Sequence, residues 1–132
     1  MELLVAATGS TLQVIRQALA GTPHRLLEVG SSAELLRACL RGQATLALVD
    51  LELGPLPGVE LIGLLREMDR DLLLVPIAGP SDPGQEFAVR TAGVFYYMIK
   101  PMDTAELLAV LESAARICAE SGEARQLQRD SA

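Results

Sequence analysis

Two charged side chains carry the most direct chemical information in this sequence. Asp50 closes the apolar run at residues 45–49, and Lys100 lies between the apolar residue Ile99 and Pro101. Ligand and reaction sites in open α/β sheets lie outside the carboxyl ends of the strands. We therefore predict that two parallel strands hold this carboxylate and this ammonium group at one edge of a sheet.

Five short apolar runs alternate with amphipathic stretches along the chain. The runs are nearly continuous in Leu, Val and Ile, which is typical of strands buried on both faces of a parallel sheet. Successive β-α units predict an α/β fold with a doubly wound parallel sheet and right-handed crossovers. The predicted strands are residues 2–6, 25–29, 45–49, 72–77 and 95–99.

Local signals mark where the helices should begin. Ser10 and Ser31 each have a Gln or Glu three residues later, which predicts a capping box, and Asp103 begins a close variant. Asp82, directly before a proline, predicts a helix start with an acceptor at the cap. Pro76 conflicts with the fourth strand because it has no amide for the ladder, so a ladder hydrogen bond is lost there unless that strand ends early or bulges.

Composition and charge limit the classes of protein. The chain has 132 residues, half of them hydrophobic, so we predict one domain at residues 1–120 and a polar tail or linker start at residues 121–132. The net charge of −6 argues against direct binding to nucleic acid, which requires a basic face. No apolar stretch reaches the length of a membrane span, and no signal peptide is recognisable. We expect a cytoplasmic protein with Cys39 and Cys118 as free buried thiols.

A small set of residues, in order and at matching spacing, resembles the receiver domain of two-component response regulators. The set consists of Asp50, Gly58, Ala92-Gly93 before the last predicted strand, and Lys100-Pro101 after it. The resemblance extends from Leu3 to about Ala119. It implies a flavodoxin-like (βα)5 three-layer sandwich with strand order 2-1-3-4-5, and it allows a cis bond between Lys100 and Pro101.

The resemblance also gives both charged residues a role. It implies that Asp50 is the phosphoacceptor, which takes a phosphoryl group from a sensor histidine kinase or a small phosphodonor, and that Lys100 contacts that group. Such a transfer needs an oxygen nucleophile, a divalent cation and a positive charge for the developing phosphoryl charge. The implied function is phosphorelay signal transduction through protein–protein contacts, without an enzymatic activity of its own.

Three positions depart from the pattern of that family. Ala7 and Thr8 stand where an acidic pair normally helps to hold Mg²⁺, and Ala78 stands where a Thr or Ser normally contacts the phosphoryl group. Ser81 would supply the missing hydroxyl only if the fourth strand were shifted. The site is therefore predicted to be degenerate.

The charge balance favours a weak metal site. Asp50 and Lys100 can neutralise each other, whereas Mg²⁺ prefers several oxygen ligands in near-octahedral geometry. Glu52 either leans over the site or is a solvated loop acid. We expect weak Mg²⁺ binding at most, at Asp50 and Glu52, no other cofactor, and slow or absent phosphorylation.

Adjacent aromatic residues suggest a contact surface. Phe95, Tyr96 and Tyr97 cannot all enter one core layer, because neighbours in a strand point to opposite faces. By resemblance, Tyr97 occupies the aromatic switch position, and the small Ala78 beside it would let the ring stay inward permanently. Aromatic residues are favoured interface anchors, so we expect the fourth helix, fifth strand and fifth helix to form a homodimer or partner face. Alternatively, the rings only cover the edge of the sheet.

Other interpretations stay open. Asp50 could be a turn residue, Lys100 a solvated lysine, and His24 a loop residue. The chain could be a phosphorylation-independent pseudo-receiver that serves as a constitutive interaction or dimerisation module. A small-ligand-binding flavodoxin-like protein is a third class, but the segment at residues 8–10 has too few glycines for a nucleotide loop.

Overall fold

The strands form a parallel sheet in the order β2-β1-β3-β4-β5, in a computed structural model that describes residues 1–42, 44–80 and 83–131, with residues 121–131 described by their backbone alone. The strands are β1 (Glu2–Ala6), β2 (Arg25–Val29), β3 (Leu46–Asp50), β4 (Leu73–Ala78) and β5 (Met98–Ile99). The helices are α1 (Gly9–Leu19), α2 (Ser32–Leu40), α3 (Gly58–Met68), α4 (Pro83–Ala92) and α5 (Thr104–Ser131). The predicted fold class and strand order are confirmed.

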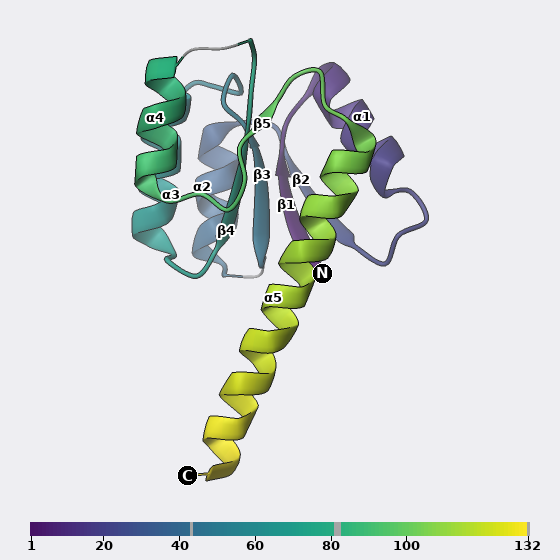
Figure 1. Ribbon diagram of the computed structural model, residues 1–132. Helices are drawn as coiled ribbons and strands as arrows, with labels where there is room; N and C mark the ends of the chain where they lie inside the picture. Colours follow the sequence, from purple (N-terminus) through teal and green to yellow (C-terminus); the bar gives the residue numbers. More distant parts are fainter. Residues whose placement is uncertain (43, 81–82, 132) are drawn as a thin grey trace.

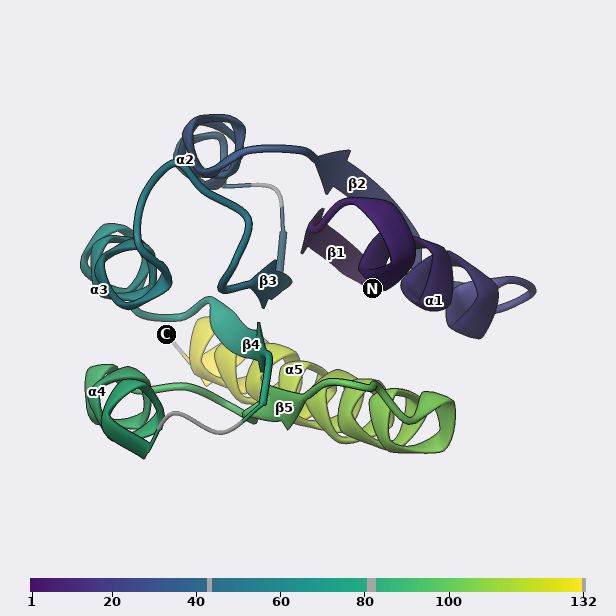
Figure 2. The same ribbon diagram turned by 90° about the horizontal axis from the view of Figure 1, so that it is seen from above.

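Helices cover both faces of the sheet (Figure 1), and the view from above separates the three layers (Figure 2). On the face covered by α1 and α5, the buried residues include Ile15 and Leu111. On the face covered by α2, α3 and α4, they include Leu35, Ile62 and Val89. Every residue of the central strand β3 is buried, which explains its continuous apolar run.

The strand bounds agree with the sequence prediction except at β5. The bounds of β1 and β2 are as predicted, and those of β3 and β4 are displaced by one residue. The fifth strand is much shorter than the predicted 95–99, because only Met98 and Ile99 pair regularly with β4. Residues 95–97 therefore lie before the strand and not within it.

Pro76 explains the short fifth strand. It lies inside β4 in register with β3, so β4 does not end early at this residue. The carbonyls of Leu74 and Ala78 accept hydrogen bonds of 2.8 Å from the amides of Phe95 and Lys100. Pro76 lies midway between these two acceptors and faces the same neighbour. Its missing amide therefore falls on the β5 side, where it interrupts the ladder without disturbing the pairing with β3.

The helix starts confirm part of the capping prediction. Ser31 caps α2 by accepting a hydrogen bond of 3.2 Å from the amide of Glu34. Asp103 accepts a bond of 2.9 Å from an amide in the first turn of α5. The prediction for Ser10 is wrong, because α1 already begins at Gly9 and its N-cap makes no side-chain hydrogen bond. Asp82 lies outside the described residues.

Helix α5 continues well beyond the sheet (Figure 1). Leu107 and Leu111 in its first half are fully buried, and its backbone stays helical to Ser131, through most of the predicted tail. Ala132 lies outside the described residues. Within the described part of the chain, no helix is both long and apolar enough to span a bilayer.

Both cysteines are free. Cys39 is buried as expected, and burial, assisted by the charge of Asp69, raises the pKa of its thiol. Cys118 is only partly buried, so the expectation of burial is wrong for this residue.

Candidate functional site

Asp50 is the last residue of β3 and lies at the carboxyl edge of the sheet. Only 7% of its surface is exposed. Its Oδ1 accepts a hydrogen bond of 2.9 Å from the amide of Glu52, and its carbonyl accepts one of 3.1 Å from Leu53. Asp50 therefore also organises the turn after β3, which was the alternative interpretation of this residue.

Lys100 directly follows β5 and meets Asp50 at that edge. Its amide donates to the carbonyl of Ala78 at 2.8 Å, which fixes the backbone beside the end of β4. Its Nζ donates to Oδ1 and Oδ2 of Asp50 at 3.1 and 3.0 Å. The bond to Pro101 is cis, the isomer that the resemblance allowed. The two charged groups meet as the strand positions predict, and their roles in phosphoryl transfer stay predictions.

The three departing positions contribute no side-chain ligand at this edge. Ala7 is buried just after β1, and Thr8 is the exposed, extended N-cap of α1. Ala78 is buried as the last residue of β4. Ser81, the alternative source of a hydroxyl, lies outside the described residues.

The oxygen atoms present do not fit the Mg²⁺ site that the receiver fold implies. Both carboxylate oxygens of Asp50 already accept from Lys100, and Glu52 is the other acid that approaches the lysine. Among the described residues, no group of three His, Cys, Asp or Glu side chains could hold a metal ion. Mg²⁺ gives up water reluctantly for so few carboxylates.

Glu52 combines the two alternatives considered for it. Its side chain is 66% exposed, yet its Oε2 lies 3.7 Å from Nζ of Lys100. Its Oε1 lies against Gly79, in the place that a Cβ atom on that residue would occupy. The carboxylate therefore leans over the site from the solvent side.

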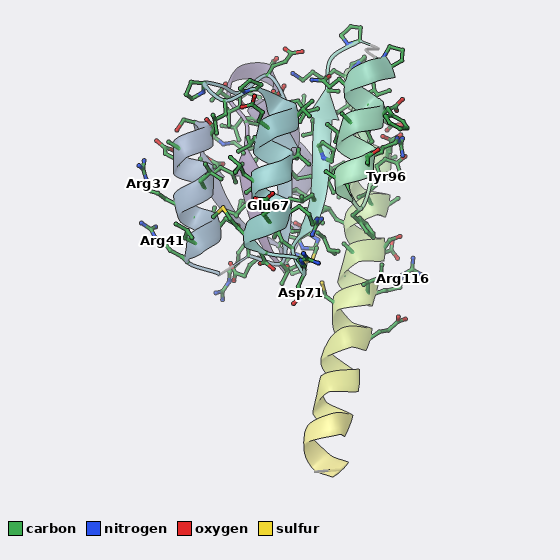
Figure 3. All side chains as sticks on the ribbon, turned by 90° about the vertical axis from the view of Figure 1, so that its left-hand side faces the viewer. Arg37, Arg41, Glu67, Asp71, Tyr96 and Arg116 are labelled. Carbon is green, nitrogen blue, oxygen red and sulfur yellow. The ribbon has the colours of Figure 1, made fainter. Side chains whose placement is uncertain are left out.

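The three aromatic residues point in different directions. Tyr97 is only 8% exposed and packs with Ala78 and Val89 in the core under α4. Phe95 packs against the core of the opposite face. Tyr96 is 39% exposed, and in Figure 3 it lies between the ribbons of α4 and α5. They do not share one core layer, as expected.

Arg90 packs on Tyr97, and sequence reasoning missed this residue. Its guanidinium carbon lies 5.3 Å from the centre of the Tyr97 ring, the geometry of a cation–π contact. It also pairs with Glu86 one turn earlier in α4, at 3.3 Å. The i,i+4 pair was visible in the sequence. The stacking on Tyr97 was not, because it depends on how α4 packs over the sheet.

An open cavity of about 400 Å³ lies beside Lys100, between the start of α1 and the loop that leads into α5. Its lining includes Val14, Pro80 and Met102, with the hydroxyl residues Ser10 and Thr11 at the helix start. It brings an apolar surface next to the charged pair.

The sequence is similar to parts of two transcriptional regulators. The chain is 29% identical over 118 residues to the DNA-binding transcriptional regulator NtrC of Azospirillum brasilense, covering 84% of this chain and 24% of that protein. It is 30% identical over 84 residues to the transcriptional regulatory protein PrrA of Mycobacterium bovis, covering 64% of this chain and 36% of that protein. The chain thus spans about a quarter to a third of the curated relatives it matches. No protein-family model matches the sequence.

Solved structures agree on the fold. A CheY-like response regulator receiver domain from Methanospirillum hungatei superposes with a TM-score of 0.79 at 21% identity, over 90% of this chain and 96% of that one. A receiver domain of a putative LuxO repressor from Vibrio parahaemolyticus gives a TM-score of 0.82 at 15% identity, over 93% and 95% of the two chains. The chain therefore has the fold of these receiver domains, and its sequence is similar to parts of the two transcriptional regulators.

Proposed function

We propose that this chain relays a signal in a two-component system through protein–protein contacts, with Asp50 as the candidate phosphoacceptor of a degenerate site. The observation that carries the proposal is the direct pairing of Lys100 with both oxygens of Asp50 at the carboxyl edge of the sheet. The partner would be a sensor histidine kinase or another signalling protein, met in the cytoplasm. The net charge of −6 disfavours direct contact with nucleic acid.

A phosphorylation-independent pseudo-receiver is the second candidate. The lack of an acid at Ala7 and Thr8 favours it, because transfer to Asp50 would lack a well-held cation. The inward Tyr97 under Arg90 also favours it, since an aromatic side chain that is already buried has no further inward movement to make. In that case the domain would act as a constitutive interaction or dimerisation module, and in neither case as an enzyme.

The proposed contact surface comprises α4, β5 and α5. It exposes Phe87, at 74%, together with Tyr96, Ile99 and Leu108. A cavity of about 230 Å³ lies between Tyr96 and α5. Exposed aromatic and aliphatic side chains of this kind are favoured at interfaces, so a second copy or a partner protein would bind there. Sedimentation at high concentration tests the homodimer, and Phe87→Ser should weaken any self-association.

Phosphodonor treatment tests the main proposal. The protein and Asp50→Asn would be incubated with Mg²⁺ and acetyl phosphate, and intact mass would be measured. Transfer forms a bond from phosphorus to a carboxylate oxygen of Asp50 and releases acetate. A slow adduct that Asp50→Asn abolishes would support a working receiver, whereas no adduct, and no change with beryllofluoride, would favour the pseudo-receiver.

A further inference from the structure

Glu52 bends back over the Asp50–Lys100 pair from the turn after β3. Its amide donates to Asp50 Oδ1 at 2.9 Å, which anchors the backbone beside the site. Its carboxylate then reaches two other segments: Oε2 lies 3.7 Å from Nζ of Lys100, and Oε1 lies against Gly79 in the loop after β4. One acidic side chain therefore joins three loops above the candidate phosphoacceptor.

Gly79 leaves room for this placement of Glu52. Its φ angle is not among the positive values found at other glycines, so the backbone there does not require glycine. Glycine leaves space at this position, because a Cβ atom there would come too close to Glu52 Oε1. The absence of a side chain at residue 79 and the reach of Glu52 are therefore complementary.

The site carries a net negative charge, because two carboxylates share one ammonium group. Lys100 is the single lysine of the chain, and its ammonium group contacts the carboxylates of both Asp50 and Glu52. An anionic group that approaches Asp50 would need this cation, and would meet one carboxylate already beside it. Ions of like sign at such short range repel each other, more strongly where solvent is partly excluded.

We propose that Glu52 is a positioning residue whose carboxylate acts as a built-in anion: it engages Lys100 over Gly79 and keeps phosphate and acyl phosphates away from Asp50. The inference deepens the proposed function, since it names what controls access to the candidate phosphoacceptor.

The single lysine makes a direct test practical. Selective isotope labelling of lysine gives one side-chain NMR signal, which is that of Lys100, and this signal would be followed while inorganic phosphate is titrated into the protein. In Glu52→Gln, which keeps the size of the side chain and removes its charge, we expect half-saturation at a phosphate concentration at least about tenfold lower than in the unsubstituted protein, equivalent to about 1.4 kcal/mol. Glu60→Gln, on the exposed side of α3, is the matched control and should behave like the unsubstituted protein.

Gly79→Ala separates the position of the carboxylate from its charge. The new methyl group would displace the flexible end of Glu52 while all charges stay in the chain, so its phosphate response should approach that of Glu52→Gln. A gain in Glu52→Gln without a gain in Gly79→Ala would overturn the proposed placement. If Glu52→Gln binds phosphate no more tightly than the unsubstituted protein, or does not bind it at all, the proposal is overturned altogether.

The same variants connect the test to phosphoryl transfer. With acetyl phosphate and Mg²⁺, the adduct at Asp50 should form faster in Glu52→Gln than in the unsubstituted protein. A slower adduct would mean that Glu52 helps to hold the cation, contrary to the proposal. The phosphate titration requires neither a partner nor transfer, so the failure of the proposed function, seen as a missing adduct, is distinguishable from the failure of this inference.

Discussion

At each end of the sheet a cationic side chain joins neighbouring segments, and these two cations, Lys100 and Arg66, have different partners. At the carboxyl edge, Lys100 binds the carboxylate of Asp50 and approaches that of Glu52. At the opposite edge, the described hydrogen bonds of the Arg66 side chain, in α3, all go to backbone carbonyls. These belong to Gly93, at 2.6 and 3.0 Å, to Arg70 and Leu72, each at 2.9 Å, and to Asp69, at 3.3 Å.

The difference separates a structural cation from a responsive one. Carbonyl groups are neutral and have fixed positions, so the planar fork of Arg66 holds the turns around α3, β4 and α4 in one geometry. The partners of Lys100 are charged groups, and a change in their charge, such as phosphorylation of Asp50, would alter its bonding. The region suited to signalling is therefore the one whose cation has charged partners.

Removal of the lysine should have the largest effect on stability. Lys100→Met leaves the carboxylate of Asp50 nearly buried without its cation, and we expect a loss of about 3 kcal/mol in the free energy of unfolding, measured in urea. The double variant Asp50→Asn/Lys100→Met should recover most of that loss, because the uncompensated charge is then gone. A loss below about 1 kcal/mol would place this pair with ordinary surface ion pairs.

Replacement of the arginine should have a somewhat smaller effect. Arg66→Lys keeps the charge but cannot reach Gly93 and the turn before β4 together, so we expect a loss of about 2 kcal/mol. Arg70→Lys, an exposed neighbour, is the control and should change stability by less than about 0.5 kcal/mol. If Arg66→Lys lowered the free energy of unfolding no more than Arg70→Lys does, the hydrogen bonds of Arg66 would contribute nothing measurable to stability.

Arg90 combines the two kinds of partner, because it contacts the neutral ring of Tyr97 and the carboxylate of Glu86. The chain has two tyrosines and no tryptophan, so in a Tyr96→Phe background the fluorescence reports Tyr97 alone. Arg90→Gln in that background should make the ring more accessible to acrylamide and cost about 0.5–1 kcal/mol. Arg16→Gln, which breaks a different surface pair, should leave the quenching unchanged.

The smallest expected effect is a pH dependence at the same end of the sheet as Arg66. Burial, and then the positive chain terminus, lower the pKa of His24 below 6.5, and among the described side chains its Nδ1 is buried without a hydrogen-bond partner. The folded state thus binds fewer protons than the unfolded state just below pH 6.5, so stability should fall as the pH drops through that range. His24→Gln should reduce this slope, as followed by thermal unfolding between pH 5 and pH 7.5. An identical slope in both proteins would assign the dependence to other groups.

The fold was predictable because its strongest signals are local. The apolar runs of β1 and β3 and the caps at Ser31 and Asp103 depend on neighbours in sequence. The short β5 was not predicted, since the effect of Pro76 falls on the strand beside it and not on its own. Ser10 failed as a cap because the N-cap of α1 is Thr8, two residues earlier than the spacing suggests.

The site was predictable only in part, for a related reason. Asp50 and Lys100 follow from strand ends, which the sequence locates well. The reach of Glu52 to Gly79, and the contacts of Arg66 and Arg90, depend on long side chains that cross between elements. Their partners are distant in sequence, and no short pattern records them.

Pro76 has a mechanical consequence for the fifth strand. The segment from Gly93 to Lys100 is fixed at both ends, by Arg66 before it and by Asp50 after it, while the proline beside its centre offers no amide. One ladder hydrogen bond to β4 is therefore missing between Phe95, whose amide binds Leu74, and the paired residues Met98 and Ile99, so the backbone there is held less tightly to the sheet. A partner that presses on the exposed Tyr96 would therefore displace this segment. The displacement would pass along the backbone to Lys100 and from its side chain to Asp50.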